Sequence, residues 1–191
     1  NLHEQLYKTD KPVKKERMSP MPTTYAHDLF GQRVYTFLTP EIRQVIRKNK
    51  NLFRIGLHGP DILFYYRPLG KNKVNQLGSR MHSESGAKFF VHAAKVLHTH
   101  DQYEKHLAYV YGVLCHFALD VTCHGYVEQT VKETGLAHIA VEGELDRKLM
   151  IMNGENPVSR RLTGYIVPSM KNAVIIKDFY RGITAKEVKK A

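Results

Sequence analysis

Apolar residues recur along most of this chain with the three- and four-residue spacing of helices that bury one face. The second of these segments begins with Thr39, Pro40 and Glu41, which supply an N-cap, a proline at the first helical position and an acidic first turn. No alternating pattern of the kind that strands show competes with the helical one. The sequence therefore predicts an all-α fold, with helices over 24–38, 40–50, 84–99, 102–127, 137–152, 169–180 and 185–191.

The predicted helix over 102–127 is apolar around much of its circumference, as a central helix would be. Gly56, Gly59 and Pro60 interrupt the pattern further upstream, so we expect Asp61 in or near a loop, facing inward before an apolar run. Residues 68–80 are polar and are interpreted as a loop. The last predicted helix stops with the chain in its second turn, which suggests that the natural protein continues.

Side chains that bind metals follow the central helix at fixed spacing. His116, Asp120 and His124 lie four residues apart, and His138 and Glu142 repeat this step on the next helix. Residues four apart share a helix face, although positions 116 to 124 climb about 12 Å, too far for a single ion. Imidazole and carboxylate are the ligands of zinc and similar metals. Because buried charges need compensation, we interpret these residues as metal ligands.

The chain has 191 residues and a formal net charge of +11, which favours anionic partners such as phosphodiesters, nucleic acid or acidic lipid surfaces. Two cysteines, Cys115 and Cys123, exclude a disulfide-rich scaffold. No apolar run approaches the length of a membrane span, and residues 1–17 lack the apolar core of a signal peptide. We therefore expect a cytoplasmic protein that contacts membranes, if at all, at their surface. Residues 1–21 are interpreted as a leader or added segment, and 22–191 as one α-helical metal-binding domain.

These motifs resemble the zinc-dependent phospholipase C family, whose fold is shared by single-strand-specific zinc nucleases. The family pattern is H-x3-D, a nearby His and then H-x3-E, and the chain matches it with His116, Asp120, His124, His138 and Glu142. His27, Asp61 and His82 match the earlier family ligands by order and context. The resemblance covers about residues 22–150, and it is greatest to the intracellular-type bacterial branch.

The resemblance implies a multi-helix fold and bound zinc. His82, His116 and Asp120 would hold one ion, with Asp61 as a ligand or general base beside it, and His124, His138 and Glu142 a second. His27 and a bridging Asp120 would hold a third. Other members complete that site with an N-terminal tryptophan, which this chain lacks, so we expect two ions. His58 lies outside the family pattern and is either a further ligand or a supporting residue.

The implied reaction is hydrolysis of a phosphodiester by a zinc-activated water, with Asp61 accepting its proton and a phospholipid headgroup as the favoured substrate. One alternative is a nuclease on the same fold, with Phe64, Tyr65 and Tyr66 stacking on single-stranded nucleic acid. The other is a non-catalytic, metal-stabilised interaction protein, in which zinc sites would be closed and purely structural.

Overall fold

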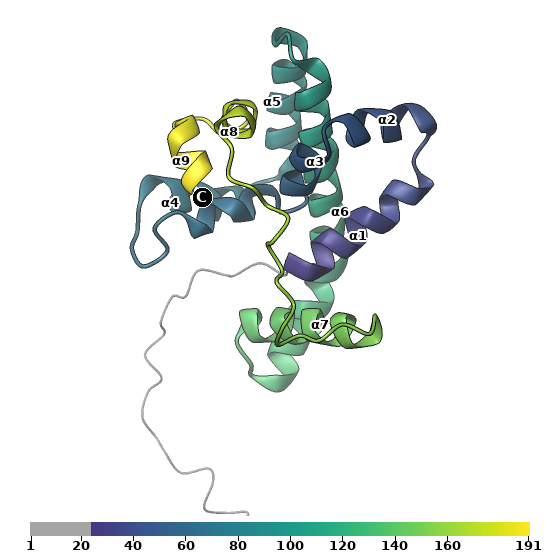
Figure 1. The fold of residues 1–191 in the computed structure, drawn as a ribbon. Coiled ribbons are helices and arrows are strands. Elements are labelled where there is room, and N and C mark those ends of the chain that lie inside the picture. The colour runs from purple at the N-terminus through teal and green to yellow at the C-terminus, as the bar shows by residue number, and fades with distance from the viewer. Residues whose placement is uncertain (1–23) are drawn as a thin grey trace, which may run out of the picture.

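The computed structural model describes residues 24–191, and within them every regular element is a helix, which confirms the all-α prediction (Figure 1). The predicted leader, residues 1–21, lies outside the described residues. The elements are α1 Thr24–Phe37, α2 Pro40–Lys48, α3 Lys50–Gly56, the 3-10 helix η1 Gly59–Tyr65, α4 Lys73–Ser83, α5 Gly86–Thr99, α6 Tyr103–Thr134, α7 His138–Met152, α8 Met170–Lys177 and α9 Ala185–Lys190.

Helix α6 is the axis of the molecule, and α1, α2, α3, α5, α7, α8 and η1 all contact it (Figure 1). Its contact with α3 is the most extensive, because Gly56 and Gly112 let the two backbones meet. A Cβ atom at Gly112 would lie 2.2 Å from the carbonyl oxygen of Phe53, so no larger residue fits there. This close crossing fixes the position of the central helix, which carries three of the eight predicted ligands, His116, Asp120 and His124.

The main core lies around the first half of α6, where α3, η1, α4, α5, α8 and α9 converge. Tyr109 and Tyr180 are fully buried there, and their hydroxyl groups are 2.7 Å apart in a hydrogen bond. A smaller core of Ile46, Phe53, Leu57 and Cys115 lies under α1 and α2. The second half of α6 leaves this core and, with α1 and α7, encloses the candidate site.

One sequence interpretation was wrong: the segment 68–80 is not a loop throughout, because α4 begins at Lys73. Asn72 caps this helix, since its side chain accepts hydrogen bonds from the backbone of Val74 and Asn75. His82 therefore lies in the last turn of α4, just ahead of α5. A rigid helix, and not a flexible connection, holds this predicted ligand.

Helix α6 also extends beyond its predicted end at 127, to Thr134, and ends at Gly135 with a left-handed φ of 69°. By length and composition alone it could cross a membrane, which the sequence analysis did not expect. The core helix of a soluble protein passes the same test, so this observation is weak evidence for a span.

Candidate metal centre

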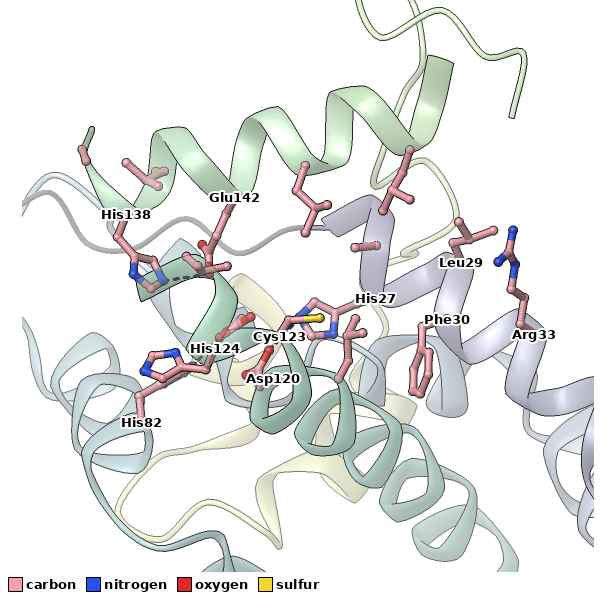
Figure 2. Close-up of a pocket in the computed structure, with 18 residues that line it drawn as sticks. His27, Leu29, Phe30, Arg33, His82, Asp120, Cys123, His124, His138 and Glu142 are labelled. Atoms are coloured by element: carbon pink, nitrogen blue, oxygen red, sulfur yellow. Dashed lines mark hydrogen bonds and ion pairs between the residues drawn. The ribbon is translucent and has the colours of Figure 1, made fainter. Parts of the chain in front are cut away.

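A cavity of about 780 Å³ lies between α1, the second half of α6 and α7. Seven of the eight predicted ligands line it, and they are His27, Asp61, His82, Asp120, His124, His138 and Glu142. Figure 2 labels all of them except Asp61. The eighth, His116, is buried in contact with Asp120. The fold therefore gathers residues from five elements, more than a hundred positions apart in sequence, around one space.

His27, His116 and Asp120 form the first ligand group. Asp120 lies between the two imidazoles, with Oδ1 3.2 Å from Nε2 of His27 and Oδ2 3.1 Å from Nε2 of His116. The two rings stack with their centroids 4.4 Å apart. Burial opposes the charge of Asp120, but its hydrogen bonds with His116 and His27 outweigh this and hold its pKa well below the usual range.

Asp61, His82 and His116 form the second group, which shares His116 with the first. Nε2 of His82 is 2.7 Å from Oδ1 of Asp61, and Nδ1 of His116 is 4.0 Å from Oδ2. Nδ1 of His82 donates to the carbonyl oxygen of Gly78 at 2.8 Å, so its Nε2 is directed at the carboxylate. Although burial alone would lower the pKa of His82, the hydrogen bond with Asp61 raises it to about 9.

Zinc fits these two groups by the chemistry of their side chains, and two of their imidazole nitrogens have no hydrogen-bond partner. Among the described residues, Nδ1 of His27 and Nδ1 of His116 are buried without a hydrogen-bond partner. A buried polar atom without a partner is costly, and a metal ion removes that cost for an imidazole nitrogen. The donor set of imidazole nitrogens and carboxylate oxygens is also the one that zinc prefers.

The remaining predicted ligands, on α6 and α7, line the same cavity but are not gathered as closely. His124 points to Glu128, with Nε2 3.0 Å from Oε1, and His138 lies 2.9 Å from Glu142 in the same way. The rings of His124 and His138 are 5.8 Å apart. Burial raises the pKa of Glu142. That these three residues bind one ion stays a prediction.

Asp146 on α7 supports the site, although its local sequence does not distinguish it from a surface residue. Its side chain is buried and accepts hydrogen bonds from the backbone nitrogens of Tyr25 and Ala26, both at 2.9 Å. A carboxylate here satisfies free donors of the first turn of α1. It therefore ties α7 to the turn that carries His27.

A second support links α1 to the loop before α8. Arg54 donates to both carboxylate oxygens of Asp28 at 2.7 to 3.0 Å, and its guanidinium lies 3.4 Å from the ring centroid of Tyr165. The hydroxyl of Tyr165 is hydrogen-bonded to Nε2 of His58, whose pKa burial lowers to about 3. Through Tyr165 and Arg54, His58 therefore supports Asp28, the residue that follows the predicted ligand His27. The local sequence gives no signal for this long-range network.

Apart from Arg33, the rest of the cavity wall is largely apolar, a feature that the sequence did not predict. The helices α1, α6 and α7 each contribute aliphatic or aromatic side chains to it, namely Leu29, Phe30, Leu119, Val127, Ile139, Leu145 and Leu149. Arg33 lines the same space further along α1 (Figure 2). A polar ligand cluster beside an apolar wall suits a substrate with one charged part and one apolar part.

The fold and the cavity define an all-helical protein whose histidine and aspartate side chains form ligand groups suited to zinc. The chain belongs to the zinc-dependent phospholipase C family, because the family model with the description "Zinc dependent phospholipase C" matches residues 26–186. No curated protein and no solved structure matches the chain. Membership confirms the suspected family and supports a phospholipase C type of function, with zinc dependence, at the level of the family.

Proposed function

We propose that the protein is a zinc-dependent phosphodiester hydrolase that cleaves phospholipids at the headgroup phosphate. One observation carries this proposal: the joined ligand groups around His116 face a cavity whose remaining wall is largely apolar, with Arg33 as its charged member. Asp61, His82, His116 and Asp120 would hold one zinc ion, and His124, His138 and Glu142 a second. His27 with Asp120 offers a third position, for which this chain lacks the family's tryptophan.

When bound, zinc supplies an acidified water and positive charge opposite the phosphoryl oxygens. The chain's own contribution is to place a base and to exclude bulk solvent. Asp61 lines the cavity with its side chain only 6% exposed, and its two oxygens face His82 and His116. In the proposed reaction the carboxylate oxygen of Asp61 that does not bind zinc takes the proton of the attacking water, and burial of the side chain limits the rotation of the carboxylate.

The apolar wall favours a phospholipid over the other anionic substrates that the positive charge permits. Burying the glycerol and the first methylenes of the acyl chains contributes roughly 0.8 kcal/mol for each methylene group. The nuclease alternative relied on three aromatic side chains for base stacking. Phe64 and Tyr66 are 3% and 9% exposed and belong to the interior, so only Tyr65 is accessible for stacking.

The proposal is tested with zinc-loaded full-length protein and vesicles of phosphatidylcholine, with release of diacylglycerol as the readout. We expect Asp61→Asn to lower the rate by about 100-fold or more, because the proton acceptor is lost. Asp101→Asn is the matched control, since Asp101 is an exposed aspartate outside the cavity, and it should leave the rate unchanged.

A single-stranded DNA substrate and a soluble phosphodiester are assayed in parallel. Cleavage of DNA without diacylglycerol release would support the nuclease alternative and overturn our choice of substrate. Absence of hydrolysis of all three substrates by protein shown to contain zinc would support the interaction-protein alternative.

A further inference from the structure

A second cluster of metal-binding side chains lies at the other end of α6, away from the cavity. It consists of His100, which follows the last residue of α5, His106 in the first turn of α6, and Asp178, which follows α8. His106 and His116 are ten residues apart on one helix, so the cluster lies about 15 Å along the axis from the shared ligand of the cavity. None of the three residues belongs to the sequence motifs described above.

The two imidazoles converge on one carboxylate oxygen. Oδ2 of Asp178 is 3.0 Å from Nε2 of His106 and 3.8 Å from Nδ1 of His100. Two ligand atoms on a tetrahedral zinc ion lie about 3.4 Å apart, because each bond is about 2.0 to 2.1 Å long. The observed separations fall on either side of this value. The other oxygen, Oδ1, accepts a hydrogen bond from Lys177 at 2.6 Å, so Oδ2 is the carboxylate oxygen that faces the two imidazoles.

The hydrogen-bonding pattern of His106 requires a proton or a metal ion between its ring and Asp178. Nδ1 of His106 is 3.0 Å from the carbonyl oxygen of Gln102, which can only accept, so Nδ1 carries a hydrogen. Nε2 therefore faces Asp178 either with a bare lone pair or through a positive species. A bare lone pair against a carboxylate at 3.0 Å is repulsive, so a proton or a metal ion lies there.

The same local arrangement occurs at the family's metal centre. His82 donates from Nδ1 to the carbonyl four residues earlier and directs Nε2 at the carboxylate of Asp61. His106 donates from Nδ1 to the carbonyl four residues earlier and directs Nε2 at the carboxylate of Asp178. A hydrogen bond that fixes the remote ring nitrogen is the usual way in which proteins orient a metal-ligating histidine.

The second histidine of the cluster gives a metal ion a third ligand. The rings of His100 and His106 stack with centroids 4.9 Å apart and an angle of 27° between their planes. Two neutral rings in this arrangement can share one ion with Asp178, whereas a proton on His106 would serve only that ring and the carboxylate. His100 is 41% exposed, which leaves a path for the ion and a position for water, while His106 is almost fully buried.

A fourth residue holds the carboxylate in place. His92 on α5 bonds through Nε2 to the backbone oxygen of Asp178 at 3.1 Å, and its Nδ1 faces Arg181. This contact ties the end of α8 to α5, so the aspartate is presented from a supported backbone. Imidazole ligands exclude magnesium and calcium, which take oxygen ligands, and favour zinc or a similar transition metal.

We propose that His100, His106 and Asp178 form a further zinc site, outside the cavity and independent of it, that joins the start of α6 to the ends of α5 and α8. Its role is structural, because it links three elements of the main core and lines none of the cavity that holds the ligand groups. The proposal does not rest on the hydrolytic activity proposed above.

The test is the zinc content of full-length protein that has been equilibrated with zinc sulfate and freed of excess metal by gel filtration. We expect His100→Ala to contain one zinc ion fewer per chain than the wild type, and Asp178→Asn to lose the same ion. His98→Ala is the matched control, because His98 is an exposed histidine in the last turn of the same helix, and it should lose none.

Two further readouts separate this site from the cavity and from misfolding. Hydrolysis of a soluble phosphodiester by His100→Ala should equal that of the wild type, and its circular dichroism should retain the full helical signal. Added zinc should raise the melting temperature of His100→Ala by less than that of the wild type, because one stabilising ligand is missing. Equal zinc content in wild type, His100→Ala and Asp178→Asn would overturn the proposal and assign a proton to the cluster. Zinc loss of the same size in His98→Ala would also overturn it.

Discussion

The two sides of the cavity carry the same kinds of ligand but hold them differently. On the side formed by α1, η1, α4 and the middle of α6, five ligands already lie in two joined groups. On the side formed by the end of α6 and by α7, His124 and His138 each pair with a carboxylate four residues further along their own helix. The first side is largely buried, whereas the His124 side chain is 60% exposed.

The difference shows what arranges ligands before a metal binds. His27, Asp61 and His116 are each at most 6% exposed, and nearby hydrogen bonds or close packing limit their rotamers. His124 lies on α6 and Glu142 on α7, and the cavity lies between the parts of these helices that carry them. We infer that zinc binds the first side with little rearrangement, and that binding on the second side costs the rotation of His124 away from Glu128.

The largest expected effect comes from removing the aspartate that bridges the two imidazoles of the first side. Asp120→Asn should lower phosphodiester hydrolysis by about 1,000-fold or more, because several kcal/mol of charge stabilisation depends on the metal. The steady-state rate and the zinc content are measured together, with Asp101→Asn as the control. A variant that keeps both its zinc and its rate would contradict the assignment of Asp120.

A smaller effect is expected from the cap of α1. Asp146→Ala should lower the free energy of unfolding of the metal-free protein by about 1 to 2 kcal/mol, because two first-turn backbone donors lose their partner. Urea denaturation measures this, and Glu144→Ala on the same helix is the control, since its surface ion pair with Arg147 contributes little. Equal losses in both variants would show that Asp146 has no capping role.

The pKa of His82 gives the first side a defined pH dependence. A pKa raised to about 9 from 6.5 means that, without metal, the stabilising pair with Asp61 is complete below pH 6.5 and is lost as the pH rises through 9. Zinc needs the deprotonated nitrogen, so its affinity should change in the opposite direction.

We expect the apparent zinc affinity of the first side to rise by about tenfold for each pH unit between 6.5 and 8, as one proton is released. Competition with a chelator of known affinity measures this slope, and His82→Gln should flatten it. A pH-independent affinity in the wild type would mean that His82 is not a ligand.

The smallest expected effect is on zinc affinity at the second side of the cavity, where His124 pairs with Glu128. Glu128→Gln should increase zinc affinity there by a few-fold, because an ion pair of this exposed kind is worth less than about 1 kcal/mol. Isothermal titration of zinc-free protein measures the change. Glu133→Gln, which removes a charge from the same helix away from His124, should have no effect. Weaker binding in Glu128→Gln would show that Glu128 itself acts as a ligand.

Local sequence was sufficient for the helical class and for the polar side chains of the cavity, but not for its apolar wall. Spacing placed His116 and Asp120 on one face of α6, and the helix supplies that geometry whatever surrounds it. The start of α4 was missed, because the capping arrangement of Asn72 and Asn75 lies within a stretch whose polar composition is also typical of loops.

The supports of the site depend on tertiary contacts that no local pattern contains. Asp146 lies about 120 residues from the backbone that it caps, and Arg54 pairs with Asp28 across two helices. A surface aspartate and a buried cap have the same sequence signature. The pairing of His106 with Asp178, 72 residues away, was missed for the same reason.

The position of zinc in the first side of the cavity is the central claim, and anomalous diffraction at the zinc absorption edge tests it most directly. We expect crystals of zinc-loaded protein to show an anomalous peak within bonding distance of Asp61, His82 and His116. Zinc-loaded crystals with no peak among these three side chains would contradict the claim.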